Sequence, residues 1–169
     1  MCSIYYFAAP HFSIMIQRIQ SIFLFLAALA MGLLFLPAMS FITIPFGDLS
    51  ELQSAEQAML GDAVFDVGDH IILLALTVVC IVLAVSSLLL FKNRPLQMKL
   101  GRILVIGISL VVLLSVLLFY LDFKLLAAGT EITVEYGYVL PVLALVFTIL
   151  AIRAIRKDED LVRSADRLR

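Results

Sequence analysis

Four side chains suited to metal or acid–base chemistry lie close together in the stretch GDAVFDVGDH: Asp62, Asp66, Asp69 and His70. Carboxylates and an imidazole are ligand types that divalent cations accept. The spacing matches no calcium-binding loop, however, and the stretch offers only one histidine. We therefore interpret it as a solvated acidic loop, and an enzyme built on these residues is the weakest hypothesis for this chain.

Other chemical motifs are absent from the sequence. It contains no Gly-rich phosphate loop, no zinc-protease pair, no nucleophile elbow and no paired-cysteine metal site. The apolar spans described below also lack Asp, Glu, Lys, Arg and His, whereas ion-coupled carriers use ionisable groups inside the membrane. We expect no enzymatic activity, and hence no catalytic, cofactor-binding or metal-binding residues.

The composition indicates a membrane protein. The chain has 169 residues, which is the length of one domain, and 63% of them are hydrophobic. Its mean hydropathy is +1.13, and a soluble protein this apolar would expose large patches that aggregate. The net charge of -1 gives no indication of nucleic-acid binding. Cys2 and Cys80 cannot form a disulfide framework, and we expect Cys80 to be a small buried hydrophobe.

Four apolar segments are long enough, or nearly so, to cross a bilayer as helices, which takes roughly 20 residues. They are residues 19–36, 71–91, 103–121 and 136–152. Open strands would leave unpaired backbone groups in lipid, so helices are the expected structure. The sequence therefore predicts an all-α membrane protein with four transmembrane helices, followed by a tail of residues 153–169.

The charges between these segments predict the orientation. The connector FKNRPLQMKLGR carries Lys92, Arg94, Lys99 and Arg102 and no acid. The connector, Arg18 and the tail lie on one side of the four spans and together hold eleven bases and four acids. Segments 37–70 and 122–135 lie on the other side and hold one base and nine acids. The positive-inside rule places the basic face in the cytoplasm, so we expect both termini there.

Several local features add to this picture. Pro95 fits the first turn of the third helix, where its missing N–H costs nothing. We interpret residues 1–14 as a non-native upstream extension and residues 15–169 as one membrane domain, because Met15 opens a natural start. The stretches MSFITIPFG, AVFDV and TEITVEYGY have strand-like patterns, and two or three of them would pair as a small β cap on the outer face.

Polar and small residues within the spans have structural explanations. We expect hydroxyls such as Thr77, Ser109 and Thr148 to bond the carbonyl four residues earlier or a neighbouring helix rather than a substrate. Ala28 and Gly32, four residues apart, would let the first span approach another helix closely. We favour packing within the monomer for this pair. Pro141 lies early in the fourth span, where it would either occupy a first turn or kink the helix.

The tail AIRAIRKDEDLVRSADRLR is the most patterned polar segment. If the helix continues past the membrane, Leu161, Ala165 and Leu168 form one apolar stripe. Such a helix would be either a solvated end or a docking surface for a protein partner or anionic lipid. The candidate contact residues of the connector and tail are Arg94, Lys99, Arg102, Arg156, Lys157, Glu159, Arg163 and Arg167.

Three segments, MIQRIQSIFL, RPLQMKLGR and above all AIRKDEDLVRSADRLR, resemble a known family. It is a Bacteroidota family of four-helix membrane proteins, numbered 4293 among domains of unknown function. The resemblance covers residues 15–169 and implies an integral protein of the bacterial inner membrane with no assigned activity. It supplies no catalytic residues.

Two functional hypotheses remain beside the enzyme. The favoured one is a non-catalytic accessory or scaffold protein, whose connector and tail engage a cytoplasmic protein partner or anionic lipid. The alternative is a protein that handles a small molecule or lipid in a cavity of the bundle. The two differ in whether changes in the tail or changes at Ser86, Ser109 and Thr148 abolish function.

Overall fold

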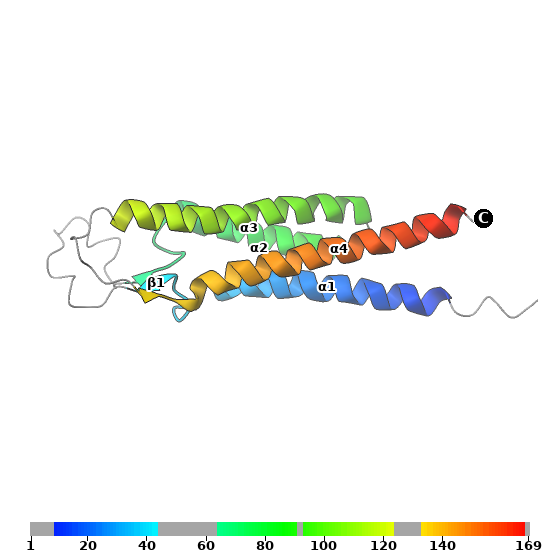
Figure 1. Cartoon of the computed structure of the whole chain (residues 1–169), viewed down its shortest axis with the longest axis horizontal. Coiled ribbons are helices and arrows are strands. Elements are labelled where there is room, and N and C mark those ends of the chain that lie inside the picture. Colours follow the sequence, from blue (N-terminus) through cyan, green and yellow to red (C-terminus); the bar gives the residue numbers. More distant parts are fainter. Residues whose placement is uncertain (1–8, 44–63, 91–92, 124–132, 168–169) are drawn as a thin grey trace, which may run out of the picture.

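The computed structural model is a helical bundle with a small sheet at one end (Figure 1). It describes residues 9–43, 64–90, 93–123 and 133–167, with only the backbone given for residues 9–18, 94, 122–123, 162–163 and 165–167. Within these ranges the helices are α1 (Ala9–Leu33), α2 (Ile71–Leu89), α3 (Arg94–Phe123) and α4 (Val139–Arg167). The strands are β1 (Ile42–Thr43), β2 (Val64–Phe65) and β3 (Thr133–Val134), and the 3-10 helix η2 (Tyr136–Tyr138) leads directly into α4.

Prolines mark the ends of the helices much as the sequence predicts. Pro95 lies in the first turn of α3, and Pro141 lies in the first turn of α4 rather than at a kink. The helix α1 ends at Leu33, earlier than the predicted Leu36, because Pro37 disfavours helical geometry in the residue before it. Tight turns follow, in which Phe35 N donates to Gly32 O and Leu36 N donates to Leu33 O.

Among the described residues, three helical stretches are long and apolar enough to cross a membrane. They are Ile71–Leu89, Pro95–Leu121 and Tyr136–Leu161. The remaining apolar helix, Ile19–Leu33, is shorter than the predicted span 19–36. Large apolar side chains point outward along the bundle, among them Phe25, Val82, Ile106 and Leu113, which are 56%, 57%, 62% and 64% exposed. Such a surface suits a lipid environment and not water.

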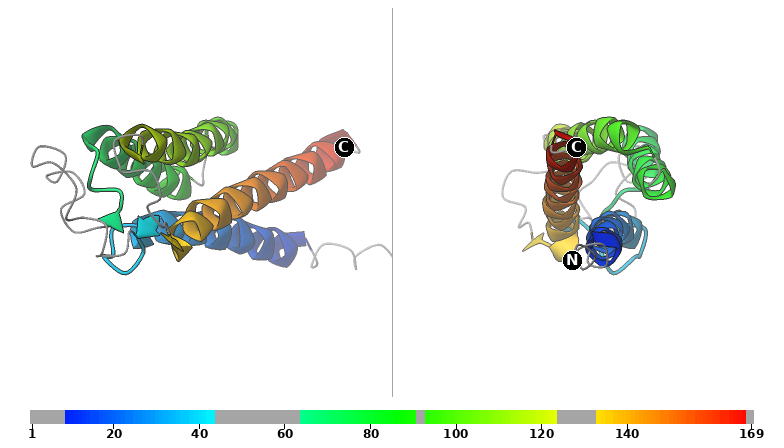
Figure 2. Two further views of the ribbon diagram at one scale, coloured as in Figure 1. Left: turned by 60° about the vertical axis from the view of Figure 1, so that its left-hand side comes forward. Right: turned by 90° about the vertical axis from the view of Figure 1, so that its right-hand side faces the viewer.

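The helices form a ring in which each contacts two neighbours. Helix α1 packs against α2 and α4, and α3 packs against the same two helices from the other side (Figure 2). The start of α1, the end of α2, the start of α3 and the end of α4 share one end of the bundle, which we call the terminal end. The sheet lies at the opposite end, the sheet end (Figure 1).

One buried stripe on each helix faces the centre of the ring. Its residues are spaced alternately three and four apart, the spacing of helices that pack knobs into holes at a small crossing angle. On α1 and just beyond it the stripe is Gln20, Leu24, Ala27, Met31 and Leu34, and on α2 it is Leu73, Thr77, Cys80, Ala84 and Ser87. On α3 it is Gln97, Gly101, Leu104, Ile108, Val111 and Ser115, and on α4 it is Ala144, Thr148, Ala151, Ile155 and Asp158.

The prediction that the strand-like segments pair as a small sheet is confirmed. The three strands pair in the order β2–β1–β3, both pairs antiparallel, with Ile42 opposite Phe65 on one side and opposite Val134 on the other. Aromatic rings join this sheet to the bundle. The Phe41 ring lies 4.8 Å from that of Tyr138, and the Phe65 ring lies 5.5 Å from that of Phe119 on α3.

Candidate functional site

Charged side chains distinguish the two ends of the bundle. At the terminal end, exposed bases project from α3 and α4: Lys99, Arg102, Arg153, Arg156 and Lys157. At the sheet end, the side chains that the structure describes include Asp66, Asp69 and Glu135, and none of them is a lysine or arginine. The terminal end is therefore the part of the molecule suited to an anionic partner.

A shallow hollow lies on the outward face of α4. It has a volume of about 360 Å³ and is lined by Arg153, Arg156, Lys157, Asp160 and Leu161. These positions follow a spacing of three and four residues, which places them on one helix face. The face is opposite the buried stripe of Ala151, Ile155 and Asp158, so it points away from the bundle.

The structure brings some of the predicted contact residues together. Arg156 and Lys157 line the same hollow, whereas Lys99 and Arg102 are exposed on the neighbouring helix α3, and Glu159 is partly buried. Arg94, Arg163 and Arg167 belong to described helices, but their side chains lie outside the described residues. Asp62 also lies outside the described part of the chain.

Sequence reasoning missed Arg153 and Asp160 as members of this surface. Both lie three or four residues from predicted members, Arg153 before Arg156 and Asp160 after it. Helical periodicity applied to the whole tail would have found them. The apolar pattern of Leu161, Ala165 and Leu168 does not include them.

Asp158 changes the interpretation of the tail. It is only 3% exposed and occupies the buried stripe of α4, three residues after Ile155. The helix therefore belongs to the bundle at least as far as Asp158, six residues beyond the predicted end of the span. Of the predicted apolar stripe, Leu161 is 48% exposed, and the side chains of Ala165 and Leu168 lie outside the described residues.

Asp158 is one of four polar residues that end the buried stripes. At the terminal end, each described stripe finishes in a polar side chain: Gln20 on α1, Ser87 on α2, Gln97 on α3 and Asp158 on α4. Helices α3 and α4 are antiparallel, and Gly101 lies opposite Ile152, since a Cβ on Gly101 would stand 2.9 Å from Cγ1 of Ile152. Asp158 is six residues after Ile152, and Pro95 is six residues before Gly101. Asp158 is therefore level with Pro95, in the first turn of α3. The positive end of a helix dipole favours a carboxylate there.

Some buried polar atoms of this region have no hydrogen-bond partner among the described residues, and Nε2 of Gln20 and Oγ of Ser87 are among them. Buried polar groups are normally satisfied by protein or water, because an unmet donor or acceptor costs about 1–3 kcal/mol. The terminal end of the bundle interior is therefore polar and suited to hydration.

The acidic stretch at the sheet end has a structural role. Asp69 Oδ2 accepts a hydrogen bond from the backbone N of Asp66 at 2.6 Å, and Asp66 Oδ1 accepts one from the backbone N of Gly68. These bonds are typical of aspartates that stabilise tight turns. The His70 ring lies 5.9 Å from that of Phe65. Within the described ranges, no three His, Cys, Asp or Glu side chains gather in a way that would hold a metal ion.

The hydroxyls of the spans bond mostly to their own helices. Thr77 donates to Leu73 O at 2.8 Å, Ser109 to Val105 O at 2.9 Å and Thr148 to Ala144 O at 2.7 Å. All three hydroxyls therefore bond the carbonyl four residues earlier, which is one of the two partners predicted for them. Cys80 is fully buried in the hydrophobic core, as predicted.

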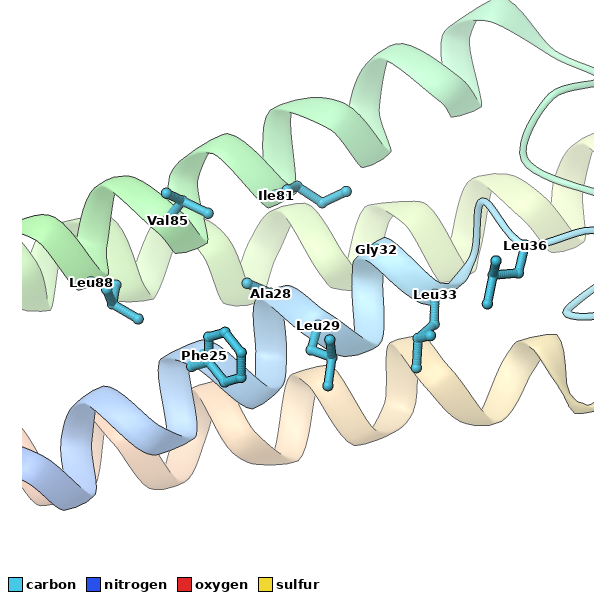
Figure 3. Close-up of a pocket in the computed structure, with 9 residues that line it drawn as sticks. All are labelled: Phe25, Ala28, Leu29, Gly32, Leu33, Leu36, Ile81, Val85 and Leu88. Atoms are coloured by element: carbon cyan, nitrogen blue, oxygen red, sulfur yellow. The ribbon is translucent and has the colours of Figure 1, made fainter.

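An apolar groove runs between α1 and α2. Its volume is about 550 Å³, and small residues of α1, Ala28 and Gly32, face Ile81 and Val85 of α2 across it (Figure 3). Gly32 is exposed, and a Cβ added to it would meet nothing within 4 Å. The prediction that this pair serves close packing within the monomer is therefore wrong for Gly32, because the two helices leave a groove at this point.

In a comparison with protein-family models, residues 16–168 match a domain of unknown function (DUF4293). The chain belongs to the DUF4293 family. The match confirms the resemblance seen in the sequence. Neither the curated proteins nor the solved structures give a match.

The family match includes the polar and basic side chains of the terminal end described above. It contains α2, α3, α4 and the sheet completely, and α1 from residue 16 onward. The basic hollow on α4 and the four polar ends of the buried stripes all lie inside it. For a DUF4293 protein, activity has to be argued from these features, since the family description assigns none.

Proposed function

We propose that this protein is a four-span protein of a bacterial inner membrane with both termini in the cytoplasm, where it acts as a non-catalytic accessory or scaffold. The observation that carries the proposal is the separation of charge between the two ends of an apolar bundle. Exposed bases gather at the terminal end, and the described charges of the sheet end are acidic. The positive-inside rule then assigns the terminal end to the cytoplasm.

The packing of α1 supports the count of four spans. Its apolar part is shorter than those of the other helices, yet it lies between α2 and α4 and packs against both. The rings of Phe23 on α1 and Phe147 on α4 stack with their centroids 6.5 Å apart. A helix held along two membrane-crossing neighbours shares their environment, so we count α1 as a span.

Cysteine labelling tests the orientation. In a chain with both native cysteines replaced by serine, Tyr136→Cys places a thiol at an exposed site of the sheet end, and Asp160→Cys places one at an exposed site of the terminal end. A membrane-impermeant maleimide should label the first variant in intact cells and the second only after permeabilisation. The reverse pattern would invert the proposed topology.

The scaffold role predicts that a cytoplasmic protein binds through the tail. Because Asp158 is buried in the bundle, the appropriate truncation removes residues 162–169 and leaves the packed part of α4 intact. The full chain and the truncated chain should be purified in mild detergent and the associated proteins identified by mass spectrometry. A partner present with the full chain and lost with the truncated chain supports the proposal. Equal recovery with both chains, or recovery of lipid alone, refutes docking through the tail.

The apolar groove favours the alternative candidate, a lipid-handling protein. Its lining, including Ala28, Gly32 and Val85, suits an acyl chain better than a polar small molecule. The substitution Gly32→Leu would place an apolar side chain at the groove, since nothing lies within 4 Å of a Cβ there. If Gly32→Leu abolished lipid handling and the truncation of residues 162–169 did not, the lipid-handling function would be favoured over the scaffold role.

A further inference from the structure

The basic hollow on α4 lies at the boundary between apolar and polar surface. Before it, α4 exposes Val142, Val146 and Leu150, and the sequence carries no charge from Tyr136 to Ile152. Arg153 follows immediately, and the three bases of the hollow extend over about 6 Å of helix, at 1.5 Å per residue. If the apolar surface lies in hydrocarbon, these bases lie at the depth of the phospholipid headgroups.

Asp158 and Asp160, which follow these bases, do not lie on the outward face of α4 at the depth of the bases. Asp158 points into the bundle and is 3% exposed. Asp160 is on the outward face, but it lies about 6 Å beyond Arg156 along the axis and therefore farther from the apolar surface. The outward face is consequently basic next to the hydrocarbon and acidic only beyond it.

The hollow is presented on a fixed helix. Ile155 and Asp158, on the opposite side of the same two turns, are 1% and 3% exposed. The contact between Gly101 and Ile152 holds α4 against α3 just before the first base. The positions of Arg153, Arg156 and Lys157 relative to the membrane are therefore set by the packing of the bundle. In a flexible polybasic tail, the positions of such bases relative to the membrane would not be fixed.

We propose that this face binds the phosphate of an anionic phospholipid, whose acyl chains lie along the exposed apolar side chains of α4. This inference rests on the proposed function only in requiring that the bundle crosses a membrane. Guanidinium groups offer paired N–H donors that match phosphate oxygens, and the lysine adds a further charge. Phosphatidylcholine carries the same phosphate, but its choline group would meet three positive charges. The site therefore favours phosphatidylglycerol.

Native mass spectrometry of the purified full chain, titrated with dioleoyl lipids, tests the site. The chain should bind phosphatidylglycerol in preference to phosphatidylcholine. The double substitution R153Q/R156Q should weaken the binding of phosphatidylglycerol roughly 10- to 30-fold, since each base near a headgroup contributes about five-fold. Binding of phosphatidylcholine should not change. Both residues are exposed, so the variant should fold normally.

The matched control is R163Q/R167Q, which removes the same charge from the same helix. These positions lie about 15 Å farther from the apolar surface by helical rise, so the control should weaken binding less than three-fold. Equal losses in the two variants, no loss in either, or no preference between the two lipids would overturn the site.

The truncation and labelling experiments separate this inference from the proposed function. A chain lacking residues 162–169 retains the hollow and should still bind phosphatidylglycerol, even if no protein docks on the tail. An inverted topology would appear in the cysteine labelling, whereas lipid binding in detergent does not depend on the side of the membrane. Binding of a peptide or protein to the hollow in place of lipid would count against the proposal.

Discussion

Replacing Gly137 by alanine should strongly destabilise the sheet end of the bundle. A Cβ at this position would stand 2.3 Å from the carbonyl O of Ser40, 2.6 Å from its C and 2.8 Å from the carbonyl O of Met39. These are backbone atoms, which cannot rotate away as the end of a side chain can. The segment η2 would have to move off the chain that follows α1.

The magnitude follows from what that movement loses. The backbone N of Gly137 donates to Ser40 O at 3.0 Å, and losing this bond costs about 1 kcal/mol. Forcing extra volume into a tightly packed position costs about 1–3 kcal/mol more. We expect the free energy of unfolding to fall by about 2–4 kcal/mol in Gly137→Ala.

Gly32→Ala is the matched control for this experiment. It adds the same methyl group where nothing lies within 4 Å, and alanine is the better helix former by about 0.5–1 kcal/mol. Far-UV circular dichroism during a titration with sodium dodecyl sulfate would measure both variants. If the two variants changed the free energy of unfolding equally and with the same sign, the argument from the close approach at Gly137 would be refuted. A Gly137→Ala variant as stable as the parent would refute it as well.

Three further predictions concern the interior. In a Cys2→Ser background, the fully buried Cys80 should not react with maleimide in mild detergent and should react fully once the chain is unfolded; rapid labelling of the folded protein would contradict its burial. Ser87→Ala should leave stability unchanged or raise it by up to about 1 kcal/mol, because the Ser87 hydroxyl is buried with no hydrogen-bond partner among the described residues. A loss above 1 kcal/mol, measured by the same titration, would reveal a partner. Phe41→Ala should cost about 3–5 kcal/mol, since this ring is fully buried against those of Phe65 and Tyr138, and a smaller cost would mean that the sheet is not packed on the bundle.

Much of the fold could be predicted from local sequence signals. Long apolar runs without charges predicted the helices, and Pro95 and Pro141 fell in first turns, because proline restricts the backbone directly around itself. The strands were predicted from β-branched and aromatic residues between Gly and Pro. The pairing order β2–β1–β3 could not be predicted in this way, since it pairs Ile42 of β1 with Val134 of β3, far along the chain.

The candidate site was only partly predictable. Counting charges found the basic face, and with it Lys99, Arg102, Arg156 and Lys157. Counting charges did not show that the Asp158 side chain points into the bundle while the Arg153 side chain points outward. Both are charged residues of α4, and the position of the neighbouring helices decides which of them is buried. The groove beside Gly32 was missed for the same reason.

The sequence by itself determined that this chain carries long apolar helices with one strongly basic end, because hydropathy and charge are properties of each segment alone. The tertiary structure decided which residues of those helices meet. Buried stripes extend into polar residues at the terminal end, and Asp158 becomes interior only because α4 continues along its neighbours beyond the last apolar residue. The basic hollow depends on the same packing, since a helix has an outward face only when the rest of the bundle covers the other one.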